Sequence, residues 1–178
     1  EPDRADYQRD LSVSHERMGD LMEALGRGEE ALARYQASLA IAERLAAAEP
    51  DRADYQRDLS VSHERMASAT QVAGDLTESA QWQLRGIEIH RRLVAGDPEN
   101  AELVCELGVK LHNMAPISND PVSMLVEVVA LLTPLAEAGL LDERGQKVLD
   151  SALNQRKGIT GLEVGPTPSA TQAGPNGS

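Results

Sequence analysis

The chain has 178 residues and a net charge of −12, and it contains no Phe, one Trp and three Tyr. Strong helix formers such as Ala, Leu, Glu and Arg dominate over the β-branched and aromatic residues typical of strands, which predicts an all-α protein. The acidic balance argues against nucleic acid and anionic membranes as partners, because both attract Lys and Arg. The single cysteine, Cys105, excludes an intrachain disulfide and fits a cytoplasmic location.

A repeat with a period of forty-eight residues organises the sequence. Glu1–Met18 and Glu49–Met66 are identical, and Met114 lies one further period after Met66. A fixed period of this length indicates stacked units, each covering the apolar face of its neighbour. We therefore predict three successive parts: a unit over 1–48, a unit over 49–96, and a divergent third unit with a capping helix over 97–157.

The first unit predicts two helices joined by a glycine turn. Residues of one helical face recur every three or four positions in its first half, at Tyr7, Leu11, Ser14, Met18, Met22 and Leu25. After Gly26 and Gly28, a second stripe follows at Ala31, Leu32, Tyr35, Leu39, Ala42, Leu45 and Ala46. Pro50 disfavours helix in the residue before it and marks the next start. The unit is expected to form a helical hairpin with both stripes buried.

The second unit repeats this arrangement. Its first stripe contains Tyr55, Leu59, Ser62, Met66, Ala69 and Ala73, and after Gly74 its second contains Leu76, Ala80, Leu84, Ile87 and Leu93. Trp82 and Ile89 lie on a neighbouring face of the second helix, which predicts burial on more than one side. Gly86 is expected to permit close approach of another helix, although Gly costs about 1 kcal/mol of helix propensity relative to Ala.

The third unit departs from the pattern. Its first helix is predicted through Leu103, Leu107, Leu111 and Met114, and the segment 115–121 interrupts it. Asp120 and Pro121 can start another helix, which Pro134 is expected to kink or end, and Asp142 can cap a last one. Residues 158–178 are mostly Gly, Pro, Ser, Thr and Ala, which predicts a disordered tail.

The first unit resembles the tetratricopeptide repeat in the spacing of seven positions, namely His15, Met18, Gly19, Met22, Gly26, Ala31 and Tyr35. The second unit keeps Gly74 but has Ala67, Thr70, Ser79 and Gln83 at other such positions, and Pro116 disrupts the third. The period exceeds the usual length of about 34 residues by about fourteen, close to four helical turns. The resemblance implies a right-handed α–α superhelix of about three helix pairs plus a capping helix. A repeat of the HEAT type is the alternative.

No combination of residues predicts catalysis, cofactor binding or a metal site. His15-Glu16 and His63-Glu64 begin like a zinc-protease motif, but the second histidine is missing after both. Ser14 and His15 are neighbours on a helix and point about 100° apart, so they cannot form a nucleophile–base pair. We interpret His90 and His112 as isolated surface or packing residues, and we expect this chain not to be an enzyme.

The resemblance implies that the first helix of each pair lines a concave groove for a protein or peptide. The matching residues of this chain are Val13, Glu16, Asp20, Glu23, Val61, Glu64, Ser68 and Gln71. Chaperone-binding members hold a peptide carboxylate with Lys and Asn at such positions, whereas this chain has Glu16 and Glu64. We therefore predict a basic or amphipathic partner, and we expect Glu16→Lys to alter partner choice with little effect on stability. A solvated acidic helix face is the alternative.

Two functional hypotheses follow from these patterns. The first is a non-catalytic interaction scaffold, part of a longer repeat protein, that could also self-associate through the outer face of its first helix. The second is the regulatory region of a larger signalling enzyme, since similar bacterial repeats often follow a STAND-type ATPase module or accompany a CHAT-type protease. A catalytic module elsewhere in the gene product would favour the second hypothesis, and further copies of the unit would favour the first.

Overall fold

The computed structural model describes residues 4–160, which form seven α-helices and one short 3-10 helix. Their bounds are α1 (Ala5–Ala24), α2 (Gly28–Ala48), α3 (Ala53–Val72), α4 (Leu76–Gly96), α5 (Ala101–Met114), η1 (Ala115–Ile117), α6 (Pro121–Glu137) and α7 (Glu143–Thr160). No strand occurs among these residues, so the predicted all-α fold is confirmed. None of the described helices is both long enough and apolar enough to cross a bilayer.

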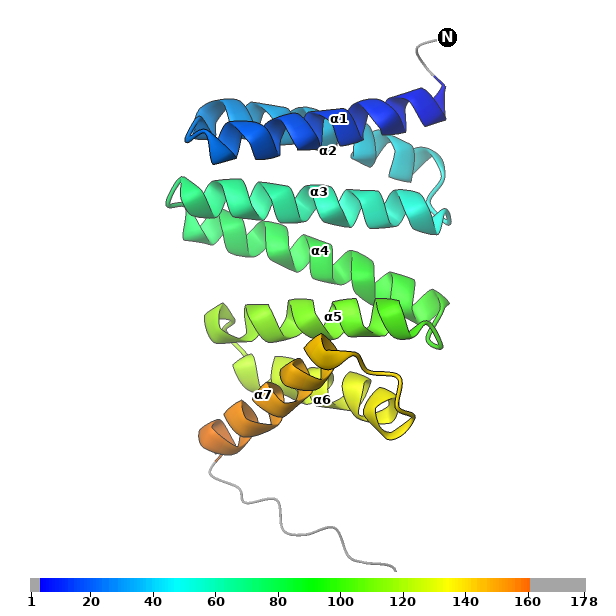
Figure 1. Ribbon diagram of the computed structural model, residues 1–178, viewed down its shortest axis with the longest axis vertical. Coiled ribbons are helices and arrows are strands. Elements are labelled where there is room, and N and C mark those ends of the chain that lie inside the picture. Colours follow the sequence, from blue (N-terminus) through cyan, green and yellow to red (C-terminus); the bar gives the residue numbers. More distant parts are fainter. Residues whose placement is uncertain (1–3, 161–178) are drawn as a thin grey trace, which may run out of the picture.

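Successive helices stack side by side into a layered array (Figure 1). The chain reverses direction at each turn, so α1 packs against α2 and α3 against α4, and the contacts of α2 with α3 and of α4 with α5 join the pairs. At the far end of the stack, α7 runs obliquely across α6 and also contacts α5. The array therefore has one end formed by α1 and another covered by α7.

Glycine turns connect the two helices of each of the first two pairs, as predicted. Gly26 and Gly74 adopt φ values of 71° and 88°, a left-handed conformation that a residue with a Cβ adopts only at a cost. The Arg27 amide donates to the Met22 carbonyl at 2.9 Å and the Gly26 amide to the Glu23 carbonyl at 2.9 Å. This bonding pattern satisfies carbonyls in the last turn of α1 and reverses the chain within the three residues between α1 and α2.

The predicted second stripe of the first unit forms the core between α2 and its neighbours. Leu32 is half-buried, and the other six members are buried, namely Ala31, Tyr35, Leu39, Ala42, Leu45 and Ala46. In the second unit, Ile87 and Ile89 are buried, but Leu76 and Leu84 are exposed, so that part of the stripe is wrong. The inward face of α4 instead includes Gly86 and His90, because Gly86 brings α4 close to Ser60 of α3.

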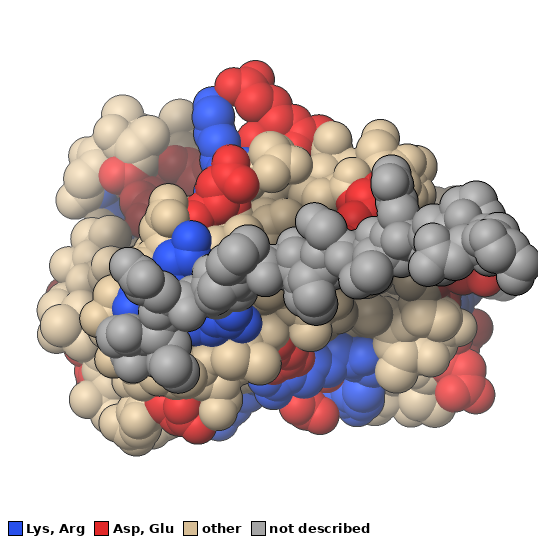
Figure 2. All heavy atoms as spheres, turned by 90° about the horizontal axis from the view of Figure 1, so that it is seen from below, with Lys and Arg blue, Asp and Glu red and all other residues tan. Residues whose placement is uncertain are grey.

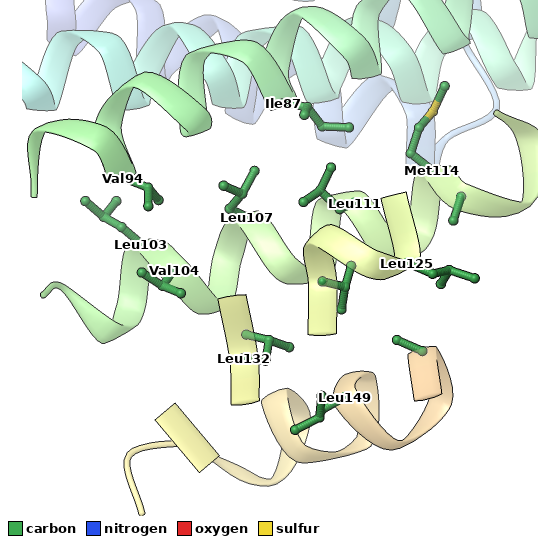
Figure 3. Packing of buried hydrophobic residues seen from close by; sticks show 13 residues of the cluster. Ile87, Val94, Leu103, Val104, Leu107, Leu111, Met114, Leu125, Leu132 and Leu149 are labelled. Carbon is green, nitrogen blue, oxygen red and sulfur yellow. The ribbon is translucent and has the colours of Figure 1, made fainter. Parts of the chain in front are cut away.

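The largest apolar cluster lies between α4 and α7 (Figure 3). Ile87 of α4 faces Leu107 and Leu111 of α5, while Leu132 of α6 and Leu149 of α7 close the other side. Gly108 permits the close approach of α5 and α6, since a Cβ there would lie only 2.9 Å from the side chain of Leu132. The divergent third unit thus carries the most extensive core of the described chain.

The first helix does not bury the stripe predicted for it. Tyr7, Leu11, Met18 and Leu25 are exposed, and the buried residues of α1 are Ser12 and Gly19. The prediction is wrong for a physical reason: α2 covers one side of α1, but no described helix covers the other. The same residues in α3 lie between two helices, and there Tyr55 and Met66 are buried.

The third unit follows the prediction except at two points. The Asp142 carboxylate accepts from the Gly145 amide at 2.7 Å and so caps α7, as expected. Pro134 lies inside α6, which continues to Glu137, so this proline does not end the helix. Helix α7 extends to Thr160, and the predicted tail over 158–178 therefore begins in helix, while residues 161–178 lie outside the described part of the chain.

Candidate interaction groove

A pocket of about 590 Å³ lies where the second helix pair meets α5. Side chains of α3, α4 and α5 line it, and Ile117 and Arg144 complete its rim. Four of the predicted groove residues belong to this lining, namely Val61, Glu64, Ser68 and Gln71. These four residues of the second unit therefore share one hollow.

The four predicted residues of the first unit, Val13, Glu16, Asp20 and Glu23, do not line this pocket. Glu23 instead borders a separate hollow of about 370 Å³ beside Leu32 and Val72. Four of the eight predicted positions thus line the first hollow and one lines the second, whereas Val13, Glu16 and Asp20 line neither.

The acids of α1 already have internal hydrogen-bond donors. Glu16 accepts from the hydroxyls of Ser38 and Ser62, both at 3.0 Å. Asp20 and Glu23 accept from the Tyr35 hydroxyl at 2.8 and 3.0 Å, and Asp20 also pairs with Arg65 at 3.1 Å. Burial raises the pKa of the Tyr35 phenol, and the two carboxylates raise it further, so Tyr35 stays a donor at neutral pH. These acids hold α1, α2 and α3 together. Because they already have donors within the molecule, they no longer support the prediction of a basic partner.

We therefore expect Glu16→Lys to reduce stability, in contrast to the expectation from sequence. The substitution removes the acceptor of two buried hydroxyls, a loss that costs about 1–3 kcal/mol. Urea unfolding followed by circular dichroism measures the change. Glu43→Lys, on the exposed side of α2, carries the same charge reversal and serves as the control. Equal midpoints for both variants would show that the Glu16 bonds contribute nothing.

A pattern of charges joins the first helices of consecutive units, and the sequence analysis missed it. Arg9 binds Asp58 through two hydrogen bonds of 2.5 and 3.1 Å and Asp54 through one of 3.2 Å. One period later, Arg57 binds Glu102 at 2.8 Å and Glu106 at 2.6 Å. Both arginines reach forward by 45 and 49 residues, so the same bonding recurs at each junction. The sequence could have indicated these contacts, because an arginine is followed by acidic residues 45 and 49 positions later in both units.

His90 connects α3, α4 and α5 at the edge of the pocket: it is a buried packing residue, as one of the two interpretations had it, but it is not isolated. Its Nδ1 lies 2.9 Å from the Ser60 hydroxyl, and its Nε2 lies 3.2 Å from a carboxylate oxygen of Glu106. A serine, a histidine and an acid in a row resemble a catalytic triad, but Ser60 is 0% exposed and its hydroxyl cannot reach a substrate. The row therefore serves to join three helices.

Lys110 places a second charge contact at the same junction. Its ammonium group contacts the carboxylate of Glu64, the groove acid of α3. Burial and, to a lesser extent, the nearby positive charges of Arg144 and Arg57 together lower the pKa of Lys110 to about 8. Glu64 and Glu106 are thus both paired, whereas Arg144 has no acidic group within ion-pair distance among the described residues.

Figure 2 views the molecule from the end that carries α6 and α7, where acidic and basic side chains are scattered among uncharged ones. No group of three His, Cys, Asp or Glu side chains within residues 4–160 could hold a metal ion.

Comparison with known proteins includes a weak structural likeness. No protein-family model matches the chain, and no curated protein matches it either. Among solved structures, the chain is similar to BtubC (BKLC) from P. vanneervenii, with 14% sequence identity and a TM-score of 0.40. The similarity covers 94% of this chain and 71% of that one, and a likeness of this size identifies no shared function.

Proposed function

We propose that this protein is a non-catalytic interaction scaffold that binds an amphipathic protein segment in the pocket between α3, α4 and α5. The observation that carries the proposal is the combination of an apolar wall with one unpaired cation. Ile117, which is 59% exposed, and the half-buried Val61 both line the pocket, as does Arg144. Aliphatic side chains of a partner fit the first two residues, and a carboxylate fits the third.

The charges of the pocket support an acidic group in the partner more than a basic one. Lys110 neutralises Glu64, and Arg57 together with His90 engages Glu106, which leaves Arg144 in excess. The resemblance of the first unit to tetratricopeptide repeats also supports peptide binding by the first helices of the pairs.

The proposal is tested by panning a random peptide library against the full chain and titrating the selected peptides by fluorescence anisotropy. We expect selected peptides to combine an acidic with an aliphatic residue. Arg144→Glu should weaken their binding about tenfold, which corresponds to about 1.4 kcal/mol.

Lys157→Glu is the matched control, because it makes the same charge reversal on the exposed side of α7, outside the pocket. Its affinity should equal that of the unmodified chain. An unselective library, or unchanged affinity of the Arg144→Glu variant, would reject the groove as the binding site.

A further inference from the structure

Two copies of one helical sequence occupy different surroundings in this protein. Residues 5–18 of α1 and residues 53–66 of α3 are identical. Nevertheless, Tyr7 is 52% and Met18 39% exposed, while their counterparts Tyr55 and Met66 are 2% and 3% exposed. Because the sequence is the same, the difference lies entirely in what packs against each helix.

Helix α2 covers the face of α3 that is open in α1. Tyr55 packs in a cluster with Ile41, Leu45 and Ala46 of α2. Met66 packs with Ala31, Tyr35 and Leu39 of the same helix. The open face of α1 is defined by Tyr7, Leu11 and Met18. These are the same side chains that α2 covers on α3, so a helix like α2 could cover them on α1.

Acidic residues on α1 extend the same comparison to charge. Asp54 and Asp58 of α3 receive Arg9, and Glu102 and Glu106 of α5 receive Arg57. The corresponding residues of α1, one period before Asp54 and Asp58, are Asp6 and Asp10. No described residue donates to the Asp10 carboxylate, so half of this acceptor pair is open.

Asp6 can accept an incoming arginine although Arg4 already binds it. The equivalent residue, Asp54, shows this directly, because it accepts from Arg52 at 2.9 Å and from Arg9 at 3.2 Å together. Asp6 and Asp10 of α1 thus correspond to Asp54 and Asp58 of α3, which bind Arg9 where α1 meets α3.

We propose that the outer face of α1 binds a helical hairpin of the same kind as residues 1–48. The second helix of that hairpin covers Tyr7, Leu11 and Met18, and its first helix places an arginine between Asp6 and Asp10. Two independent observations carry this inference, namely the covered apolar face of α3 and the repeated pairing of arginine with two acids. The inference does not depend on the peptide-binding pocket.

A second intact copy of the chain is a poorer occupant than a free hairpin. The face of α2 that would cover α1 is already buried against α3 of its own molecule. This changes the expectation of self-association. The outer face of α1 is open, but the face of α2 that would fit it is buried within each folded copy.

The test adds one further copy of residues 1–48 directly before Glu1 of the full chain, so that the new junction repeats the one at Glu49. Met18→Cys in a Cys105→Ser background reports access to the face through its rate of reaction with a thiol reagent. We expect the Met18→Cys thiol of the extended chain to react at least about tenfold more slowly than in the original chain. Its rate should approach that of a Met66→Cys variant of the original chain, which serves as the buried reference.

Two matched controls separate docking from tethering. Leu39→Asp with Leu45→Asp in the added copy alone should restore fast labelling. Arg9→Asp in the added copy should also speed labelling, and combining it with Asp6→Arg and Asp10→Arg in the original copy should slow it again. Equally fast labelling with and without the added copy would overturn the proposal. A dimer of the original chain with Met18→Cys protected would overturn it in favour of a second copy.

Discussion

Met66→Asp is expected to unfold the middle of the array, whereas Met18→Asp is expected to leave the protein folded. Met66 is buried against α2 and α4, and removing a buried methionine side chain costs about 2–5 kcal/mol before any charge is considered. An unpaired carboxylate at the same place adds a desolvation penalty, and the total approaches the whole stability of a typical domain. Far-UV circular dichroism during thermal unfolding measures the loss.

Met18 is an unusually close control for this experiment. It is the same residue within the same eighteen-residue sequence, but it lies on the open face of α1. Exposed substitutions typically change stability by less than about 0.5 kcal/mol. Comparable losses in the two variants would mean that α1 and α3 are equally covered, and the stacking order of the helices would then be wrong.

Gly19→Ala is the second substitution with a large expected effect. A Cβ at Gly19 would lie 2.4 Å from the ring of Tyr35, which is fully buried and hydrogen-bonded to Asp20 and Glu23. The ring cannot move aside without losing those bonds. We expect overpacking to lower the free energy of unfolding by about 1–3 kcal/mol, measured by urea titration.

Gly86→Ala provides the contrast, because a Cβ there meets its nearest neighbour at 3.5 Å, an ordinary contact. The gain in helix propensity should make this variant neutral or more stable, by up to about 1 kcal/mol.

The second unit has Ala67 and Gln83 where the first has Gly19 and Tyr35. Adding Tyr35→Gln to Gly19→Ala should therefore cost less than the sum of the two single changes. Strict additivity would refute the steric explanation.

The local features of the fold could be predicted because each depends on neighbours in sequence. The turns at Gly26 and Gly74 need a left-handed residue, and the buried stripe from Ala31 to Ala46 follows helical spacing. Burial of α1 could not be predicted in this way, since its sequence equals that of α3. Only the position in the stack distinguishes the two helices.

The candidate site was predictable only in part. Resemblance placed Val61 and Glu64 in the groove, but no pattern within one helix indicated that Lys110, forty-six residues later, would pair with Glu64. His90 appeared isolated because its partners belong to two other helices. To predict contacts between units, one must know which residues of neighbouring helices lie opposite each other. The forty-eight-residue period gives this information when it is used to compare the positions of charged residues.

The position that holds Arg9 and Arg57 in the first two units is occupied by Cys105 in the third. Helix α5 therefore lacks the cation that would reach the next pair of acids, and α7 lies across the surface where another unit would stack. The stacking proposed above is therefore one-sided within residues 4–160: a further hairpin can dock on α1, whereas α7 covers the equivalent surface at the other end.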